Sequence, residues 1–172
     1  MDENVERHLV YIGLGSNLGD SVTILRSALA TLRSHSAIDT LRVSRLYRSK
    51  PIGPQNQPDY WNAVASFYTT LTPEVVLALL LAIEKQQGRE RESSVRWGAR
   101  TLDLDILLYE QCIMSTATLT IPHPYLTARA FVVYPLLDLD PKLVLPTGEA
   151  LTNYLPSLQE QASTLEISAF TL

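Results

Sequence analysis

The sequence contains almost no cysteine and no long apolar segment. Cys112 is the single cysteine among 172 residues, so neither a disulfide framework nor a cysteine-based zinc site can form within the chain. This favours the reducing cytoplasm. The longest apolar run, residues 75–83, is too short to span a bilayer, and the charged N-terminus "MDENVERH" lacks the apolar core of a secretory signal. We therefore expect a cytoplasmic protein that does not bind membranes.

An excess of positive charge is also missing. The net charge is −4, which disfavours a general electrostatic role on nucleic acids or anionic membranes. The phosphate-binding pattern G-x-x-x-x-G-K-[ST] does not occur, which excludes a P-loop enzyme. The stretch "YIGLGSNLGD", residues 11–20, has the spacing G-x-G-x-x-x-G, one residue longer than the dinucleotide-binding fingerprint. We interpret its glycines as a tight turn between a strand and a helix.

The composition, with 46% hydrophobic and 19% charged residues, is typical of a globular protein, and the length favours one domain over residues 1–172. Apolar periodicity predicts strands over 8–14, 38–48, 61–70 and 102–109, and helices over 21–34 and between 72 and 88. Asp20 is expected to cap the first helix. The order βαββαβ is typical of the ferredoxin-like α+β plan, an antiparallel sheet with both helices packed on one face. A short strand near 117–121 and helices after 127 and 148 would extend it.

The stretch "RWGARTLDLDILLY", residues 96–109, carries the strongest chemical pattern. Asp103 and Asp105 point to one face of the expected strand, because side chains alternate across a strand. Adjacent carboxylates repel each other unless a cation neutralises them, and Mg²⁺ prefers oxygen ligands together with waters and phosphates. Two magnesium ions held by this pair could clamp a transferring phosphoryl group. The alternative is an ordinary solvated strand face.

Four arginines precede this pair, and an aromatic–amide pair follows a proline-rich loop. Guanidinium groups bind phosphate oxygens, so the arginines could hold a polyanionic substrate; alternatively, they pair with Glu90 and Glu92 on the surface. Tyr60 and Asn62 share one face of the strand after loop 49–60, which suits a flat, hydrogen-bonding heterocycle. The alternative for Tyr60 is ordinary packing of its ring. The four arginines are Arg89, Arg91, Arg96 and Arg100.

Four stretches occur in a consistent order: "GLGSNLGD", "SRLYRSKPIGPQNQPDYWNAV", "RWGARTLDLDILLY" and "IPHPYLTARAFVVYPL". In this combination the chain resembles the 6-hydroxymethyl-7,8-dihydropterin pyrophosphokinases of folate biosynthesis, from about residue 9 to residue 148. The resemblance implies the same ferredoxin-like fold. It implies an enzyme that moves pyrophosphate from ATP to the hydroxymethyl group of a reduced pterin and releases AMP. It also implies that the glycine stretch helps to wall the pterin pocket.

The resemblance further assigns roles to individual residues. Asp103 and Asp105 would bind two Mg²⁺ ions, and Arg89 and Arg100 would act with them as catalytic residues on the phosphates. Positions that would contact ATP are Arg91, Trp97, Ile106, Thr120, His123 and Arg129. Positions that would contact the pterin are Ser49, Lys50, Ile52, Tyr60, Asn62 and Phe131, with Tyr60 and Phe131 on its two faces. Lys50 departs from the small residue or proline that is common in this family.

The expected partners are two small molecules, ATP as co-substrate and the hydroxymethyl dihydropterin, with no nucleic acid and no membrane. The protein is expected to act as a monomer. The alternative function is a non-catalytic ferredoxin-like module that binds a nucleotide or RNA. Such a module needs exposed aromatic side chains and a basic sheet face. The net charge of −4 and the aspartate pair argue against it.

Overall fold

The structure, a computed structural model, describes residues 5–51, 56–88 and 101–172. The strands are β1 (His8–Ser16), β2 (Ile38–Val43), β3 (Tyr47–Ser49), β4 (Tyr60–Thr69), β5 (Asp103–Tyr109), β6 (Met114–Ser115), β7 (Thr120–Ile121) and β8 (Glu166–Ile167). The α-helices are α1 (Ser21–Ser34), α2 (Pro73–Gln86), α3 (Ala130–Leu139) and α4 (Gln159–Ala162), and two 3-10 helices span Leu126–Ala128 and Leu151–Leu158. The predicted order βαββαβ is confirmed, with the second strand divided into β2 and β3.

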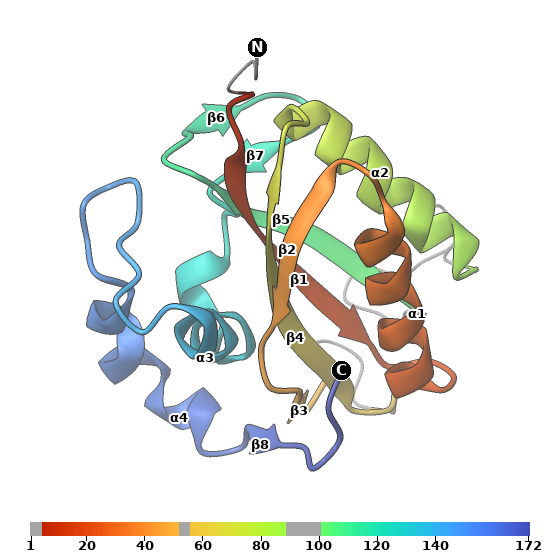
Figure 1. Cartoon of the computed structure of the whole chain (residues 1–172). Helices are drawn as coiled ribbons and strands as arrows, with labels where there is room; N and C mark the ends of the chain where they lie inside the picture. The colour runs from red at the N-terminus through yellow and green to blue at the C-terminus, as the bar shows by residue number, and fades with distance from the viewer. Residues whose placement is uncertain (1–4, 52–55, 89–100) are drawn as a thin grey trace.

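The main sheet is antiparallel throughout the described residues. β4 lies beside β1 on one side and beside β2 and β3 on the other, while β5 flanks β1 and β8 flanks β3. α1 and α2 cover one face of the sheet, and α3 lies against the opposite face (Figure 1). This arrangement is the ferredoxin-like α+β plan that the sequence predicts, with additional C-terminal elements.

The predicted strand over 38–48 is interrupted at residues 44–46. The Ser44 hydroxyl oxygen accepts a hydrogen bond from the main-chain N–H of Val64 at 2.9 Å, and Ser44 N–H donates to Val64 O at 2.8 Å. A side-chain oxygen therefore takes the place of a main-chain acceptor, and the ladder restarts at β3. Sequence alternation does not reveal this interruption, because it depends on a partner on another strand.

The sheet separates two hydrophobic cores. Ile12 and Leu14 of β1 belong to the core beneath α1 and α2, whereas Tyr11 belongs to the core beside α3. The next β1 positions on the α3 side are Gly13 and Gly15, because side chains alternate along a strand. Glycine has no side chain, so this part of the sheet surface is left hollow.

A β-bulge in β5 lets this strand contribute side chains to both hydrophobic cores. The pairing of β5 with β1 shifts by one residue at Leu107. Leu107 and Leu108 consequently both join the core beside α3. Before the bulge the strand alternates regularly, so Asp103 and Asp105 lie on one face and the buried Leu104 on the other. The predicted orientation of the aspartate pair is therefore confirmed.

Capping residues explain where the helices begin. The Asp20 carboxylate accepts a hydrogen bond from Thr23 N–H at 3.2 Å at the start of α1, as predicted. Thr72 accepts from Val75 N–H at 3.4 Å at the start of α2, and Pro73 occupies its first turn. None of the described helices combines the length and the apolar character that a membrane crossing requires.

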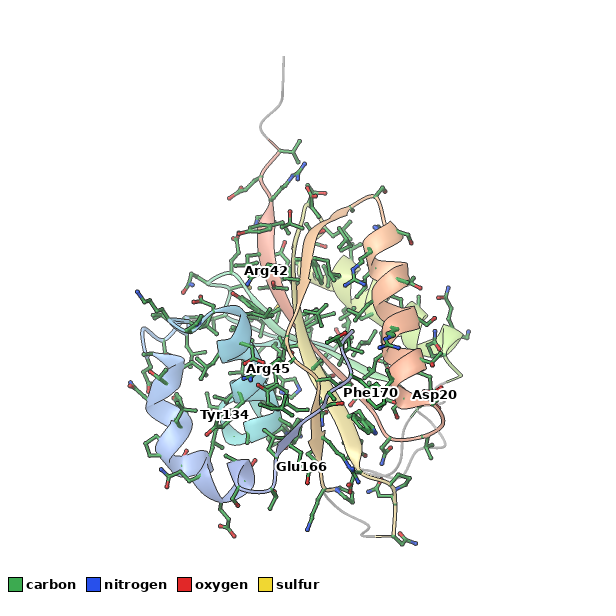
Figure 2. All side chains as sticks on the ribbon, turned by 60° about the horizontal axis from the view of Figure 1, so that its bottom comes forward. Asp20, Arg42, Arg45, Tyr134, Glu166 and Phe170 are labelled. Carbon is green, nitrogen blue, oxygen red and sulfur yellow. The ribbon has the colours of Figure 1, made fainter. Side chains whose placement is uncertain are left out.

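The C-terminal elements differ in detail from those expected. The strand expected near 117–121 is β7, which pairs with β6 in a separate hairpin. The helix expected after 127 is α3. After 148 the chain forms a 3-10 helix containing Pro156, which lacks a main-chain donor, and then the short α4. β8 pairs with β3, and Figure 2 shows Glu166 and Phe170 on this segment beside the sheet.

Candidate functional site

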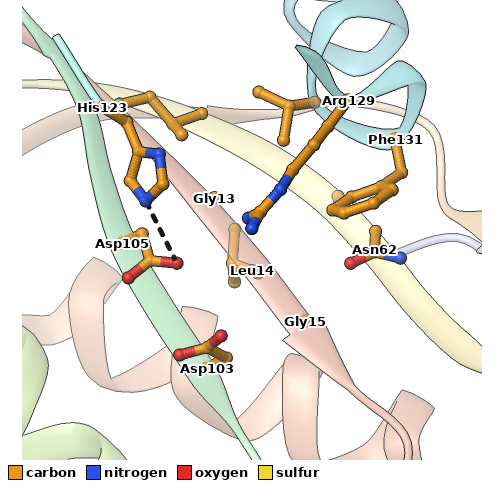
Figure 3. Close-up of a pocket in the computed structure, with 12 residues that line it drawn as sticks. Gly13, Leu14, Gly15, Asn62, Asp103, Asp105, His123, Arg129 and Phe131 are labelled. Carbon is orange, nitrogen blue, oxygen red and sulfur yellow. Dashed lines mark ion pairs between the residues drawn. The ribbon is translucent and has the colours of Figure 1, made fainter. Parts of the chain in front are cut away.

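A pocket opens over the hollow part of the sheet, between β1, β4, β5 and the segment that leads into α3 (Figure 3). Its position follows from the two glycines of β1. Gly13 pairs with Asp105 and Gly15 pairs with Asp103, so the carboxylates stand beside positions without side chains. The lining residues are Gly13, Leu14, Gly15, Asn62, Ala63, Asp103, Asp105, Leu107, His123, Arg129, Phe131 and Val132. The glycine stretch therefore does wall a pocket, as expected.

His123 lies beside β5, with its imidazole ring next to Asp105 (Figure 3). Its Nε2 lies 4.0 Å from an Asp105 carboxylate oxygen, beyond hydrogen-bond distance. The ring Nδ1 accepts a hydrogen bond from the main-chain N–H of Tyr125 at 3.1 Å, and the main-chain N–H of His123 donates to Leu107 O at 3.0 Å. Burial, and then the Arg129 guanidinium, lower the pKa of His123. The neutral ring consequently carries its proton on Nε2, directed toward the pocket.

Arg129 enters the pocket from the residue that precedes α3, and its guanidinium is directed toward Asp103 and Asp105 (Figure 3). Burial lowers the pKa of Arg129, and the two carboxylates oppose that shift. An arginine side chain remains charged after a shift of this kind. The pocket therefore contains two carboxylates facing one guanidinium and one imidazole N–H.

Asn62 lines the end of the pocket near Phe131 (Figure 3). Its side chain is buried, and its Nδ2 donates a hydrogen bond to Ser49 Oγ at 3.0 Å. The register of β3 and β4 brings Asn62 and Ser49 together. Asn62 pairs with Tyr47, and Ser49 is two residues further along β3, on the same face of the sheet. An oriented amide beside an aromatic ring can bind the edge and the face of a flat heterocycle.

A second cavity, of about 380 Å³, lies on the other side of the Arg129–Phe131 wall. It is formed by the end of β3, the segment around the 3-10 helix Leu126–Ala128, and α4 with the chain that follows it. Its lining residues are Ser49, Lys50, Tyr125, Ala128, Arg129, Ala130, Phe131, Gln161, Thr164 and Leu165. Two predicted pterin-side residues, Ser49 and Lys50, therefore line this cavity rather than the pocket with the aspartates.

The structure does not bring every predicted residue to the pocket. The side chain of Ile106 lies in the core under the helices, on the strand face opposite Asp105. Thr120 is exposed on β7. Tyr60 is half-buried at the start of β4, donates to Gln57 Oε1 at 3.5 Å, and lines neither cavity. Ile52, Arg89, Arg91, Arg96, Trp97 and Arg100 lie outside the described residues.

Sequence reasoning missed Glu84 of α2. This glutamate is 2% exposed, and its carboxylate accepts a hydrogen bond from Leu104 N–H at 3.4 Å, between the two aspartates of β5. The buried acid thus joins α2 to the strand that carries the pair. A signal was present in the sequence: Glu84 continues the four-residue spacing of the buried Val76 and Leu80.

The aspartate pair suits a magnesium ion better than a metal that needs a complete protein cage. Among residues 5–51, 56–88 and 101–172, no group of three or more His, Cys, Asp or Glu side chains is arranged to hold a metal. Magnesium usually takes one or two carboxylates and completes its shell with waters and substrate phosphates. The Asp105 side chain is 38% exposed, which leaves room for such ligands.

The fold and the pocket define the class of the protein as a ferredoxin-like transferase, in which a carboxylate pair opposes cationic and hydrogen-bond-donating side chains. This combination is typical of phosphoryl transfer. Comparison with known proteins identifies the particular family. The model of the family 7,8-dihydro-6-hydroxymethylpterin-pyrophosphokinase (HPPK) matches residues 11–141, and the chain belongs to this family. The resemblance found in the sequence is therefore confirmed, and the non-catalytic alternative is excluded.

Two curated relatives are named 2-amino-4-hydroxy-6-hydroxymethyldihydropteridine pyrophosphokinase. The chain is 48% identical over 142 residues to the Haemophilus influenzae protein, covering 83% of this chain and 88% of that protein. It is 45% identical over 146 residues to the Pseudomonas aeruginosa protein, covering 85% and 89%. A crystal structure of Plasmodium falciparum HPPK-DHPS has a TM-score of 0.73 at 15% identity, covering 96% of this chain. This chain spans about half of that one (48%), and the likeness supports the fold alone.

Proposed function

We propose that the protein catalyses the magnesium-dependent transfer of pyrophosphate from ATP to 6-hydroxymethyl-7,8-dihydropterin in folate biosynthesis. One observation carries this proposal: the aspartate pair, a guanidinium, an imidazole N–H, a buried amide and an aromatic ring line one pocket. Relatives with 45–48% identity are named pyrophosphokinases, which supports the same reaction here.

In this reaction a bond forms between the hydroxymethyl oxygen and the β-phosphorus of ATP. The bond from that phosphorus to the oxygen shared with the α-phosphorus breaks, so AMP is the leaving group, and the proton of the hydroxyl group is released to water. Asp103 and Asp105 are the residues that would hold Mg²⁺, and the bound ion would supply charge neutralisation for the phosphates. Phosphoryl transfer depends mainly on positioning and on charge neutralisation, which these side chains can provide.

Arg129 and His123 would donate hydrogen bonds to phosphate oxygens, His123 from beside Asp105 and Arg129 from the segment that leads into α3. The guanidinium compensates negative charge, and the neutral imidazole offers an N–H without adding charge. Arg89 and Arg100 are proposed to act on the same phosphates, with Arg91, Trp97, Ile106 and Thr120 contributing to ATP binding. The support for Trp97, Ile106 and Thr120 is the family resemblance, and for the three arginines it is that resemblance together with the affinity of guanidinium groups for phosphate.

Asn62 and Phe131 would bind the edge and one face of the pterin. Because Asn62 Nδ2 donates to Ser49 Oγ, the other amide atom, Oδ1, faces the pocket. Tyr60 is proposed for the other face, and Ile52 and Lys50 for the neighbouring loop. We also propose that the protein acts as a cytoplasmic monomer without nucleic-acid or membrane partners; its net charge of −4 supports the last point.

The deciding experiment is phosphorus NMR of a reaction with ATP, Mg²⁺ and the hydroxymethyl dihydropterin. AMP and the pterin diphosphate are expected. ADP as the nucleotide product, or no turnover, would reject the proposal.

Variants of the aspartate pair test the residues that carry the proposal. Asp103→Asn and Asp105→Asn should each lower turnover by about 100-fold or more, because each removes a carboxylate that would hold Mg²⁺ beside the reacting phosphates. Both carboxylates are partly exposed, so thermal stability should change little. Asp39→Asn, in an exposed ion pair with Arg7, is the matched control and should retain turnover. Full activity in either pocket variant would remove that residue from the proposed site.

A further inference from the structure

We infer that Tyr125 is a positioning residue of the active site, whose ring holds the Arg129 guanidinium in the pocket with the aspartate pair. The inference rests on the proposed function, because it concerns the orientation of a residue assigned there to the phosphates. Tyr125 has no role in the family resemblance described above. Its exposed fraction of 42% also shows that its ring is not part of either core.

The ring lies under the guanidinium at close range. The central carbon of the Arg129 guanidinium is 4.7 Å from the Tyr125 ring centroid and 5.6 Å from the Phe131 centroid. Both distances lie within the range of a cation–π interaction, in which the negative ring face attracts the cation. Tyr125 is the closer of the two, and half-burial of Arg129 strengthens the attraction by removing water.

The ring adds to the attraction of the two carboxylates in orienting Arg129, whose side chain borders two cavities. One is the pocket with Asp103 and Asp105, and the other is the cavity of about 380 Å³ that Lys50 also lines. Arginine loses about 2 kcal/mol of rotamer freedom when it is held in one place. A ring that packs against the guanidinium reduces the number of orientations open to it and so favours the pocket.

The backbone around Tyr125 determines where its ring stands. Tyr125 N–H donates to His123 Nδ1 at 3.1 Å, and Tyr125 O accepts from Ala128 N–H at 3.1 Å. His123 O in turn accepts from Leu126 N–H at 3.1 Å. This short segment therefore holds the imidazole and the ring as a unit, with their centroids 6.0 Å apart. The same residue orients both donors that face the carboxylates.

The test compares Tyr125→Leu with Tyr125→Phe. Leucine removes the ring face, and we expect kcat/KM for ATP to fall by about 2- to 30-fold, which corresponds to the range of cation–π interactions from exposed to desolvated sites. The loss should appear in kcat and in the affinity for ATP, with KM for the pterin nearly unchanged. Phenylalanine keeps the ring and should restore kcat/KM to within about twofold. Tyr68→Leu, at a tyrosine that is 41% exposed, is the matched control and should keep its kcat/KM.

A double-mutant cycle shows whether Tyr125 acts through Arg129. ATP affinity is measured by calorimetry in the presence of Mg²⁺, so that the cycle does not require turnover. In the background of Arg129→Gln, Tyr125→Leu should have no further effect. An equal effect in both backgrounds, an unchanged Tyr125→Leu variant, or a phenylalanine variant as impaired as leucine would each overturn the inference.

Failure of the proposed reaction can be separated from failure of this inference. If the unaltered protein gave no AMP, the proposed function would fail, while the cycle in ATP affinity would still decide the role of Tyr125. Thermal denaturation of each variant shows whether the fold is retained.

Discussion

Gly15 lies where a side chain would crowd the amide of Asn62. A methyl group built on Gly15 would be 3.0 Å from Asn62 Oδ1, closer than ordinary van der Waals contact. The amide has little freedom to move, since Asn62 is 6% exposed and its Nδ2 donates to Ser49 Oγ at 3.0 Å. We therefore predict that Gly15→Ala rotates the amide away from the orientation proposed for pterin binding.

The magnitude follows from the two interactions that the rotation disturbs. Loss of the hydrogen bond to Ser49 costs about 1 kcal/mol, and a strained rotamer of Asn62 costs about 0.5–1.5 kcal/mol. In the variant, the Asn62 amide can return to its binding orientation only at this cost in free energy. We therefore expect kcat/KM for the pterin to fall by roughly 10- to 70-fold. The free energy of unfolding should change less, because alanine restricts the unfolded chain and offsets about 0.4–1 kcal/mol.

The assay measures AMP release against pterin concentration at saturating ATP, with thermal denaturation as a check on the fold. Gly13→Ala is the comparison variant: it also places a methyl group in the pocket, but the three atoms nearest to that group belong to Leu107 at 3.6–3.7 Å, so the Asn62 amide is not displaced. Equal losses of kcat/KM for the pterin in the two variants would refute the argument. An unchanged kcat/KM in Gly15→Ala would do the same.

Two further predictions concern stability. Asp138→Ala should lower the free energy of unfolding by about 1.5–4 kcal/mol, because its carboxylate accepts from the buried Tyr47 hydroxyl at 2.7 Å and pairs with an arginine. Asp39→Ala removes an exposed ion pair and should cost less than about 1 kcal/mol; urea denaturation compares the two, and equal costs would contradict the prediction. At Asp20, hydrogen bonds from Thr23 lower the carboxyl pKa, so its contribution is present above the unfolded pKa and is lost as pH falls through the folded pKa. Because asparagine also caps helices without titrating, the Tm difference between Asp20→Asn and the unaltered protein should shrink as the pH falls below the unfolded pKa, whereas a constant difference would contradict this.

The fold was predictable to the extent that it depends on local patterns. Asp20 and the apolar spacing after it predict α1, and the proline in the first turn together with the apolar run predicts α2. The interruption at Ser44 was not predictable, because the serine bonds to Val64 on another strand. The sequence predicts a helix after 148, and the segment found there is mainly a 3-10 helix, in which Pro156 supplies no main-chain donor.

In the candidate site, too, local patterns predict some features and contacts between distant segments decide others. Strand alternation alone predicts that Asp103 and Asp105 share a face, and the structure confirms it. Alternation also places the side chain of Ile106 on the opposite face, so only its backbone is available to a ligand on the pocket side. Glu84 was missed because its burial depends on the packing of α2 against β5. A glutamate on a helix is otherwise expected to be exposed.

The sequence by itself determined the order of the elements, the face that carries the aspartate pair and the family. These follow from the two-residue and 3.6-residue periods of the backbone and from motifs that are contiguous in the chain. Only the tertiary structure decided that Gly13 and Gly15 leave a hollow beside the carboxylates. It also decided that Arg129 stands between two cavities with the Tyr125 ring beneath it. Contacts of this kind depend on strand register and on packing between distant segments, which no local period encodes.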